Sequence, residues 1–445
     1  MKDAAQEETP AQVAEGPKQA GDIRARWVWV EPAVWTDRML AALEEGVKGG
    51  VWFSLIDKVT SLRALTAAWG RVLANRGCGG VDHETVQQFS REAMSRLPEL
   101  SERLRNGTYE PMPVRRTYIR KLDGKQRPLG IPAVRDRIVQ SALRNVLEPI
   151  FEREFCEHSY GFRPGRSAKD ALRRVDGLLK AGYRYVVDAD LKSYFDTIPH
   201  DRLMDLVCQR VADSKVLALV SAFLNQGVLE GLQEWKPTVG TPQGAVISPL
   251  LANIYLHPLD ALMQKAGCEM TRYADDFVVL CRTAEEAQRV LEQIQQWTLE
   301  AGLTLHPEKT RIVNMDEAGG FDFLGYHFER GFRRPRDKSL EKFKDTVRAK
   351  TRRTNGQNIG VIIANLNRTT RGWYGYFKHS RRFVFENLDK WIRMRLRSIL
   401  RRRQGRHGRG RGTDHHRWPN AYFQTLRLFS MTAAHAQECQ LCINH

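Results

Sequence analysis

The sequence predicts an α+β fold with more than one domain. Its 445 residues are enough for more than one hydrophobic core. Short runs rich in β-branched and aromatic residues, at 185–191 and 270–280, have the composition of strands. Longer stretches, such as 64–74 and 387–403, carry apolar residues at helical spacing. We expect strands and helices to mix in the middle of the chain, with mainly helical regions on either side.

The first 130 residues divide into three parts. Residues 1–25 are mainly Ala, Glu, Gln, Pro and Gly without periodicity, which predicts a disordered tail. Residues 26–112 are expected to be helical. A hairpin is predicted at 117–129, because Asp123 and Gly124 give the strongest short-range hairpin signal. Its arms carry Lys121 and Arg127, which on the residues alone indicate only an exposed, charged hairpin.

Three Asp side chains are placed at strand ends and turns. Asp275 and Asp276 occupy a tight turn between two apolar segments, and Asp190 ends the strand before it in the chain. Adjacent carboxylates repel each other unless a cation lies between them. Three carboxylates can hold two divalent metal ions, and such a pair is suited to nucleotidyl transfer. The alternative is a solvated turn, which an Asp pair commonly marks. Asp188 shares a strand face with Asp190, so strand geometry alone does not distinguish which of the two would be the ligand.

Seven sequence blocks in a fixed order favour the metal site. They are RPLGIP, YGFRPGRS, VDADLKSYFD, GTPQGAVISPLLANIYL, YADD, GLTLHPEKT and FLGY, at 127–132, 160–167, 187–196, 240–256, 273–276, 302–310 and 323–326. Together they resemble the reverse transcriptases of bacterial group II introns, and the resemblance covers about 51–436. It implies a right-hand polymerase, with fingers and an antiparallel palm sheet at 113–330. An α-helical thumb and maturase domain would follow at 331–445.

The resemblance also implies roles for individual residues. Asp190, Asp275 and Asp276 would be catalytic and would bind two Mg²⁺ ions. Phe195 would lie under the sugar of the incoming nucleotide and select dNTP over rNTP; otherwise it is a core aromatic. Gln243 would contact the substrate from a loop that opens an apolar helix predicted at 245–256. If the family pattern is set aside, this segment is an ordinary junction between a loop and a helix. Three cations, Lys121, Arg127 and Lys309, would contact the triphosphate or the leaving pyrophosphate.

The positive charge is concentrated in the C-terminal region. The net charge is +18, and residues 331–417 hold 26 Lys and Arg against 6 Asp and Glu, which leaves 44 against 46 elsewhere. This density predicts a polyanionic partner. Basic helices are predicted at 342–353 and 387–403, while the aromatic residues of 371–377 favour helix packing over base stacking. The candidate nucleic-acid contacts, which include two residues of the YGFRPGRS block, are Arg163, Arg166, Lys342, Arg348, Arg352, Arg353, Arg371, Arg393, Arg397 and Arg401.

The resemblance implies an RNA-directed DNA polymerase that also assists intron splicing and retrohoming. Its partners would be group II intron RNA, target DNA with a DNA primer, and dNTPs. One alternative is a splicing maturase without polymerase activity, which the intact Asp trio disfavours. Another is a reverse transcriptase recruited for defence or DNA repair. The sequence does not determine the oligomeric state.

The hydropathy of the chain and its cysteines indicate where the protein is located. No apolar stretch is long enough to span a bilayer and no signal peptide is evident, so we expect a cytoplasmic protein without a membrane partner. Seven scattered Cys fit reduced thiols, and the Cys439, Cys442 and His445 set favours free thiols over zinc. A DNA endonuclease domain is not expected, as in the class C lineages of the family.

Overall fold

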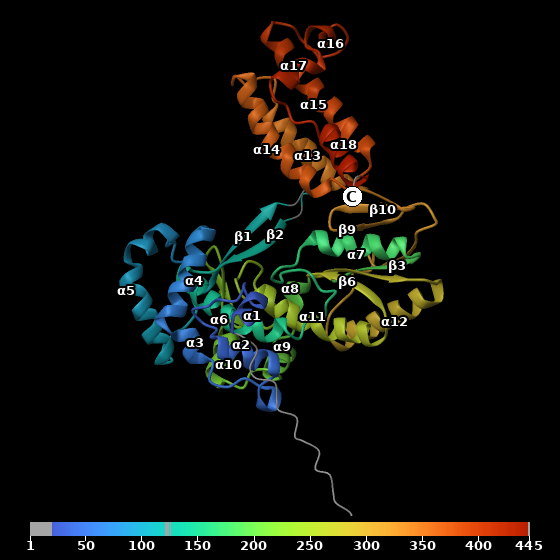
Figure 1. Cartoon of the computed structure of the whole chain (residues 1–445). Coiled ribbons are helices and arrows are strands. Elements are labelled where there is room, and N and C mark those ends of the chain that lie inside the picture. Colours follow the sequence, from blue (N-terminus) through green and yellow to red (C-terminus); the bar gives the residue numbers. More distant parts are fainter. Residues whose placement is uncertain (1–19, 121–123, 125, 444–445) are drawn as a thin grey trace, which may run out of the picture.

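The computed structural model describes residues 20–120, 124 and 126–443 (Figure 1). The prediction of disorder at 1–25 is wrong for its last residues, because Ala20–Arg26 forms helix α1. Residues 1–19 lie outside the described residues, and so do Lys121, Asp123 and His445. Among the described residues, no helix is both long and apolar enough to cross a membrane.

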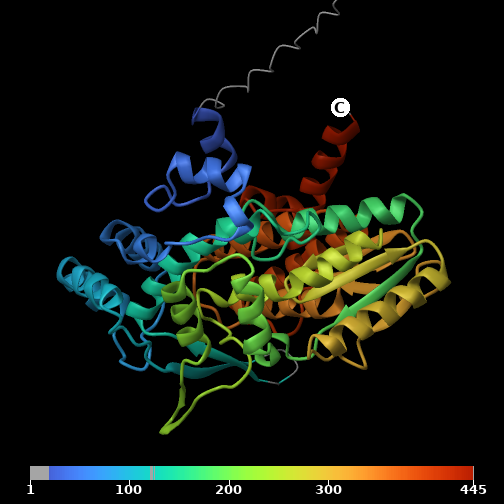
Figure 2. The same ribbon diagram turned by 90° about the horizontal axis from the view of Figure 1, so that it is seen from below.

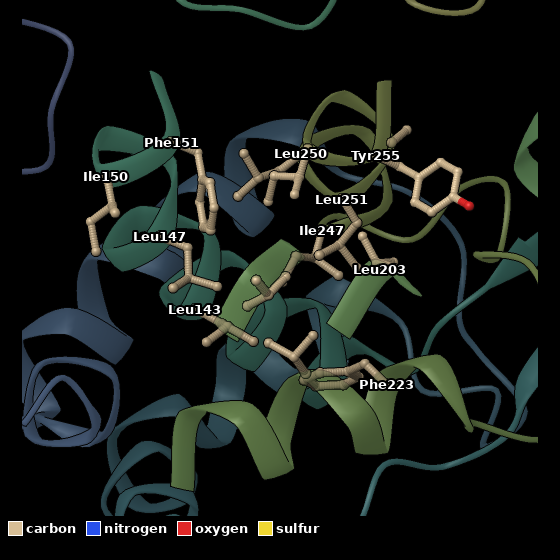
Figure 3. Close-up of a cluster of buried hydrophobic side chains, with 14 of the residues drawn as sticks. Leu143, Leu147, Ile150, Phe151, Leu203, Phe223, Ile247, Leu250, Leu251 and Tyr255 are labelled. Carbon is tan, nitrogen blue, oxygen red and sulfur yellow. The ribbon is translucent and has the colours of Figure 1, made fainter. Parts of the chain in front are cut away.

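The N-terminal region is helical, as predicted. Its elements are α2 (Asp37–Glu45), the 3₁₀ turn η1 (Lys48–Gly50), α3 (Ile56–Thr60), α4 (Leu62–Asn75) and α5 (Val86–Arg105). Helix α4 packs against α6 (Val134–Glu152), which is buried on almost every side. Figure 3 shows how α6 meets α9 (His200–Cys208), α10 (Ser214–Leu224) and α11 (Ser248–Lys265) through apolar side chains. The same hydrophobic core continues into the palm strands, where it includes Val187 and Val279.

A four-stranded sheet forms the fingers in the order β2-β1-β4-β5. Its strands are β1 (Val114–Arg120), β2 (Gln126–Ile131), β4 (Val228–Glu230) and β5 (Gln233–Trp235). The predicted hairpin is confirmed, since β1 and β2 are antiparallel with Arg120 opposite Gln126.

The palm sheet has the order β6-β7-β3-β8, and all its neighbouring strands are antiparallel. Its strands are β3 (Tyr185–Asp190), β6 (Glu269–Tyr273), β7 (Asp276–Cys281) and β8 (Arg311–Asn314). Because side chains alternate along a strand, Val187 and Val279 join the core of α11 and α12 (Ala284–Glu300), whereas Val186 and Val278 join the core of α7 (Ala168–Lys180). That second face is also covered by a small sheet of β9 (Phe321–Phe323), β10 (Tyr326–Glu329) and β11 (Phe332–Pro335). Figure 2 shows the palm strands and their helices from below.

The helix predicted at 245–256 begins later and runs further than expected. It is α11, which starts at Ser248 with a proline in its first turn and ends at Lys265. Gly244 has φ +111°, a conformation that a helix does not contain, so residues 241–247 remain a loop. The loop therefore carries Gln243 several residues ahead of the helix.

The C-terminal region is a separate helical lobe above the palm in Figure 1. It contains α13 (Asp337–Lys350), α14 (Ile359–Phe377), α15 (Arg382–Arg403), α16 (Asp414–Arg417), α17 (Asn420–Thr425) and α18 (Met431–Ile443), around a core of its own. Helix α13 ends before Arg352 and Arg353, which the sequence had placed inside it. Trp373 stacks on Phe343 with ring centroids 4.4 Å apart, so the packing role favoured for this aromatic is confirmed.

Candidate active site

The palm sheet brings the three predicted Asp residues together. Asp190 on β3 is the direct cross-strand partner of Asp276 on β7, and Asp275 precedes Asp276 in the turn from β6. Asp188 lies two residues before Asp190 and therefore shares its face of the sheet. Four carboxylates thus surround one end of the palm sheet.

The turn that carries Asp275 has an unusual backbone. Ala274 has φ +61°, in the left-handed region that a non-glycine residue adopts at a cost. Gly161 lies against this turn, and a Cβ atom at that position would come within 2.2 Å of the Ala274 nitrogen. Only glycine allows the segment before α7 to approach the turn so closely.

Burial and mutual repulsion make three of these carboxylates hard to ionise. Burial, followed by the charges of Asp188, Asp275 and Asp190, raises the pKa of Asp276 to about 7. Burial likewise raises the pKa of Asp188 to about 6, although Arg311, with Nε 3.8 Å from Asp188 Oδ2, opposes the effect. The pKa of Asp275 is also raised, chiefly by burial. The protein alone therefore compensates this negative charge poorly.

A lysine supplies one positive charge at the site. Lys309 Nζ lies 2.6 Å from Asp190 Oδ2, and its side chain remains 58% exposed. The backbone N–H of His306, three residues earlier, donates to the Asp190 carbonyl oxygen at 2.7 Å. The segment before β8 thus holds both the backbone carbonyl and the side-chain carboxylate of Asp190. Lys309 lies beside this carboxylate.

The carboxylates have the donor chemistry that magnesium prefers. Within the residues that the structure describes, no three acidic, His or Cys side chains are grouped closely enough to enclose a metal. Magnesium needs no such cage, because one or two carboxylates commonly hold it while water and substrate phosphates complete its coordination. Together with the raised pKa values of Asp275 and Asp276, this open arrangement fits a cation that arrives with substrate.

Phe195 lies in the short helix α8 (Tyr194–Thr197), directly after β3. Its side chain is buried, with the residue 8% exposed, and its ring meets that of Phe162 edge-on with centroids 6.4 Å apart. Phe162 is 45% exposed and has φ +60°. Phe195 is therefore part of the core, the alternative left open by the sequence, and it directly precedes Asp196, which accepts a hydrogen bond from Gln243.

Gln243 connects the fingers to the palm. Its Oε1 accepts from Arg127 Nε at 2.7 Å, and its Nε2 donates to Asp196 Oδ2 at 3.1 Å. The backbone N–H of Gly130 also donates to the Gln243 carbonyl oxygen. Arg127 and Gln243 are thus in direct contact, while the side chain of Lys121 lies outside the described residues.

Three further residues support the turn from β6 to β7 that carries Asp275, and they were missed by the sequence reasoning. They are Arg272 on β6, and Asn253 and Asp260 on α11, all of them buried. Arg272 donates to both Asp260 oxygens, at 2.7 and 2.5 Å, and to the Ala274 carbonyl oxygen at 2.8 Å. The available signal was a basic residue inside a predicted strand, three residues before the Asp pair.

Two of the ten candidate nucleic-acid contacts are buried, which corrects the expectation for them. The side chains of Arg163 and Arg397 are each about 2% exposed. Arg163 pairs with Glu152 at 2.7 Å, and Arg397 donates to the Trp418 carbonyl oxygen at 2.9 Å. Neither guanidinium can reach a polyanion without leaving these partners.

The other candidates remain at least partly accessible. Five of them are exposed, namely Lys342, Arg348, Arg352, Arg353 and Arg371, and three are partly buried, namely Arg166, Arg393 and Arg401. Arg401 is less available than the rest, because it pairs with the buried Asp414 at 2.9 Å. Arg348 and Arg395 approach the ring of Trp391, at 5.9 and 5.5 Å from its centroid, which adds an aromatic residue to the basic surface.

Comparison with known proteins agrees with this arrangement. The reverse transcriptase (RNA-dependent DNA polymerase) family matches residues 119–328, and the group II intron maturase-specific domain matches residues 340–418. Protein YkfC of Escherichia coli K12 is 31% identical over 347 residues, which cover 69% of this chain and 86% of that protein. Group II intron-encoded protein LtrA of Lactococcus lactis subsp. cremoris is 42% identical over 208 residues, which cover 46% of this chain and 34% of LtrA.

Likeness to solved structures is weaker. A chain of the "Partial Cas6-RT-Cas1--Cas2 complex" is 24% identical with a TM-score of 0.36, over 56% of this chain and 41% of that chain. The sequence matches and the palm geometry are decisive. The chain belongs to the family of group II intron-encoded reverse transcriptases and maturases.

Proposed function

We propose that the protein copies group II intron RNA into DNA by two-metal nucleotidyl transfer, and that it also assists splicing and reverse splicing of that intron. The observation that carries the polymerase assignment is the cross-strand pairing of Asp190 with Asp276, beside Asp275, in a chain with a reverse transcriptase domain. A solvated turn would not bury and crowd its carboxylates in this way.

Asp190, Asp275 and Asp276 would hold two Mg²⁺ ions. When bound, such ions lower the pKa of an attacking hydroxyl and neutralise a triphosphate. The carboxylates orient these charges at the end of the palm sheet, where β3 and the β6–β7 turn meet. Lys309 is exposed and pairs with Asp190. Its ammonium group would neutralise negative charge on the leaving pyrophosphate.

Nucleotide selection would rest on the fingers side of the site. Arg127 would bind the triphosphate from the hairpin together with Lys121, and Gln243 would hold Arg127 in position through their 2.7 Å hydrogen bond. Phe195, fixed by the core on one side, would leave no room for a ribose 2′-hydroxyl. This arrangement favours dNTPs as substrates.

The C-terminal lobe would bind the intron RNA. Its exposed basic residues on and after α13, and those around Trp391, suit recognition of folded RNA by phosphate geometry and shape. The further partners would be target DNA and its primer, and the activity would take place in the cytoplasm of a bacterial cell.

Primer extension tests the polymerase. Three proteins are each supplied with a poly(rA) template, oligo(dT), dTTP and Mg²⁺: the wild type, Asp275→Ala/Asp276→Ala and a matched control, Asp316→Ala. Asp316 is a palm carboxylate whose side chain is 69% exposed. We expect synthesis by the wild type and the control, and a loss of about 100-fold or more in the double variant. Retained synthesis in the double variant would refute the metal assignment, while a folded, RNA-binding wild type without synthesis would indicate a splicing maturase only.

A further inference from the structure

Arg272 is fully buried, with 0% of its side chain exposed, in the strand that leads into the catalytic turn. Two of its nitrogens engage Asp260 on α11 in a forked pair, with Nε 2.7 Å from Oδ1 and Nη2 2.5 Å from Oδ2. A buried charge pair of this kind is a poor stabiliser compared with apolar side chains of the same size. Its presence beside the site calls for a contribution other than stability.

The third nitrogen of Arg272 points to the turn itself. Nη1 donates to the Ala274 carbonyl oxygen at 2.8 Å and to Asn253 Oδ1 at 3.0 Å. Ala274 is the residue with φ +61°, and its carbonyl leads directly into Asp275. A strained backbone conformation persists only when the surroundings fix it, and this hydrogen bond fixes it from a rigid, buried anchor.

The same anchor also fixes the segment packed against the turn. Asn253 Nδ2 donates to the Gly161 carbonyl oxygen at 2.8 Å, and Gly161 lies against the Ala274 nitrogen. The backbone of Arg272 bonds to this segment as well, because its N–H donates to the His158 carbonyl and its carbonyl accepts from Tyr160. Helix α11, the turn and the 158–161 segment are thus connected through one guanidinium and one amide.

We propose that Arg272 is a positioning residue that sets the catalytic turn: through the Ala274 carbonyl it holds Asp275 and Asp276 in register with Asp190. Arg272 does not touch substrate, and the proposal rests on the proposed polymerase function. A lysine cannot replace it, because only the planar guanidinium engages both carboxylate oxygens while a third nitrogen reaches the turn. Asn253 extends the same support to Gly161.

The test compares Arg272→Lys with a matched Arg→Lys change in another ion pair of the same strand. Arg174 of α7 pairs with Glu269, at the opposite end of β6 from the turn, so Arg174→Lys perturbs an ion pair of the palm without touching the turn. Asn253→Ala is the second variant, because it removes one link and leaves the Arg272–Asp260 pair intact. For each protein we would measure kcat and the KM for dTTP, the Kd for primer–template, the unfolding midpoint, and Mn²⁺ affinity by electron paramagnetic resonance.

We expect Arg272→Lys and Asn253→Ala to lower kcat by about tenfold to 100-fold, with the KM for dTTP and the Kd for primer–template within about twofold. Mn²⁺ affinity should fall in both, and Arg174→Lys should keep the wild-type kcat and Mn²⁺ affinity. Wild-type kcat and Mn²⁺ affinity in both turn variants would overturn the proposal, and so would an equal loss of kcat in Arg174→Lys. If Arg272→Lys does not fold, the kcat and Mn²⁺ affinity of Asn253→Ala alone test the proposal. A wild type without synthesis would defeat the proposed function, yet the Mn²⁺ comparison would still decide the role of Arg272.

Discussion

Replacing Asp276 by Asn should stabilise the metal-free protein while it abolishes synthesis. Burial and neighbouring carboxylates raise the pKa of Asp276 to about 7, whereas an Asp in an unfolded chain titrates near 3.9. Because the folded pKa is the higher one, ionisation of this group disfavours the folded state. The cost is small below about pH 4, grows as the pH rises, and is complete above about pH 7. Asn removes the charge but can still accept a hydrogen bond from the backbone.

The size of the effect follows from the two pKa values. Their difference corresponds to about 4 kcal/mol at full ionisation, of which about 1.5 kcal/mol is already present at pH 5. The stability advantage of Asp276→Asn should therefore grow by about 2.5 kcal/mol between pH 5 and pH 8. For 445 residues the entropy of unfolding is about 0.9 kcal/mol per kelvin, so the difference in Tm should grow by about 3 °C.

Thermal unfolding in EDTA at pH 5 and pH 8, followed by circular dichroism, measures this difference. Wild type and Asp276→Asn are compared at each pH, so that titrating groups without an interaction with Asp276 cancel. A Tm difference that stays constant between the two pH values would refute the reasoning, and so would a variant less stable than the wild type at pH 8. Added Mg²⁺ should narrow the gap at pH 8, because the cation compensates the charge that Asn removes.

Three further predictions concern the turn, the sugar and the RNA. Gly161→Ala should lower kcat in primer extension by about tenfold or more with binding of primer–template retained, since its Cβ would lie 2.2 Å from the Ala274 nitrogen; an unchanged kcat would show that the turn tolerates displacement. Phe195→Val should reduce the preference for dTTP over UTP, as the ratio of kcat/KM values, by roughly tenfold or more, and an unchanged ratio would exclude this ring as the selector. Arg352→Ala/Arg353→Ala should weaken binding to structured RNA and reduce the slope of log K against log salt by about 2 in a filter-binding titration; an unchanged slope would place the RNA elsewhere.

Local patterns predicted strand β3 and the hairpins β1–β2 and β6–β7, but not strands β4, β5 and β8. The pairing of β1 with β2 and the apolar and β-branched composition of β3 depend on neighbouring residues only, so they are readable from the sequence. The ordered motifs identified Asp190 and Asp276 as site residues. The structure shows that the register of β3 with β7 sets them opposite each other. Helix α11 began later than predicted because apolar spacing does not reveal the backbone of Gly244.

Contacts between distant elements were not readable in the same way. A basic residue looks the same in the sequence whether it faces solvent or carbonyl oxygens, and so Arg163 and Arg397 were assigned to the nucleic-acid surface although both are buried. The partner of Arg272 lies on another element, α11, and no local pattern specifies that pairing. The residues that support the turn between β6 and β7 could therefore be identified only from the structure.

The most direct test of the central claim is a count of metal ions in the assembled complex. Electron paramagnetic resonance would measure Mn²⁺ bound per protein with a chain-terminated primer on an RNA template and the next dNTP. The account predicts two ions in the wild type and at most one, carried by the nucleotide, in Asp275→Ala/Asp276→Ala. Two ions in both proteins would contradict the assignment of these carboxylates as the metal site.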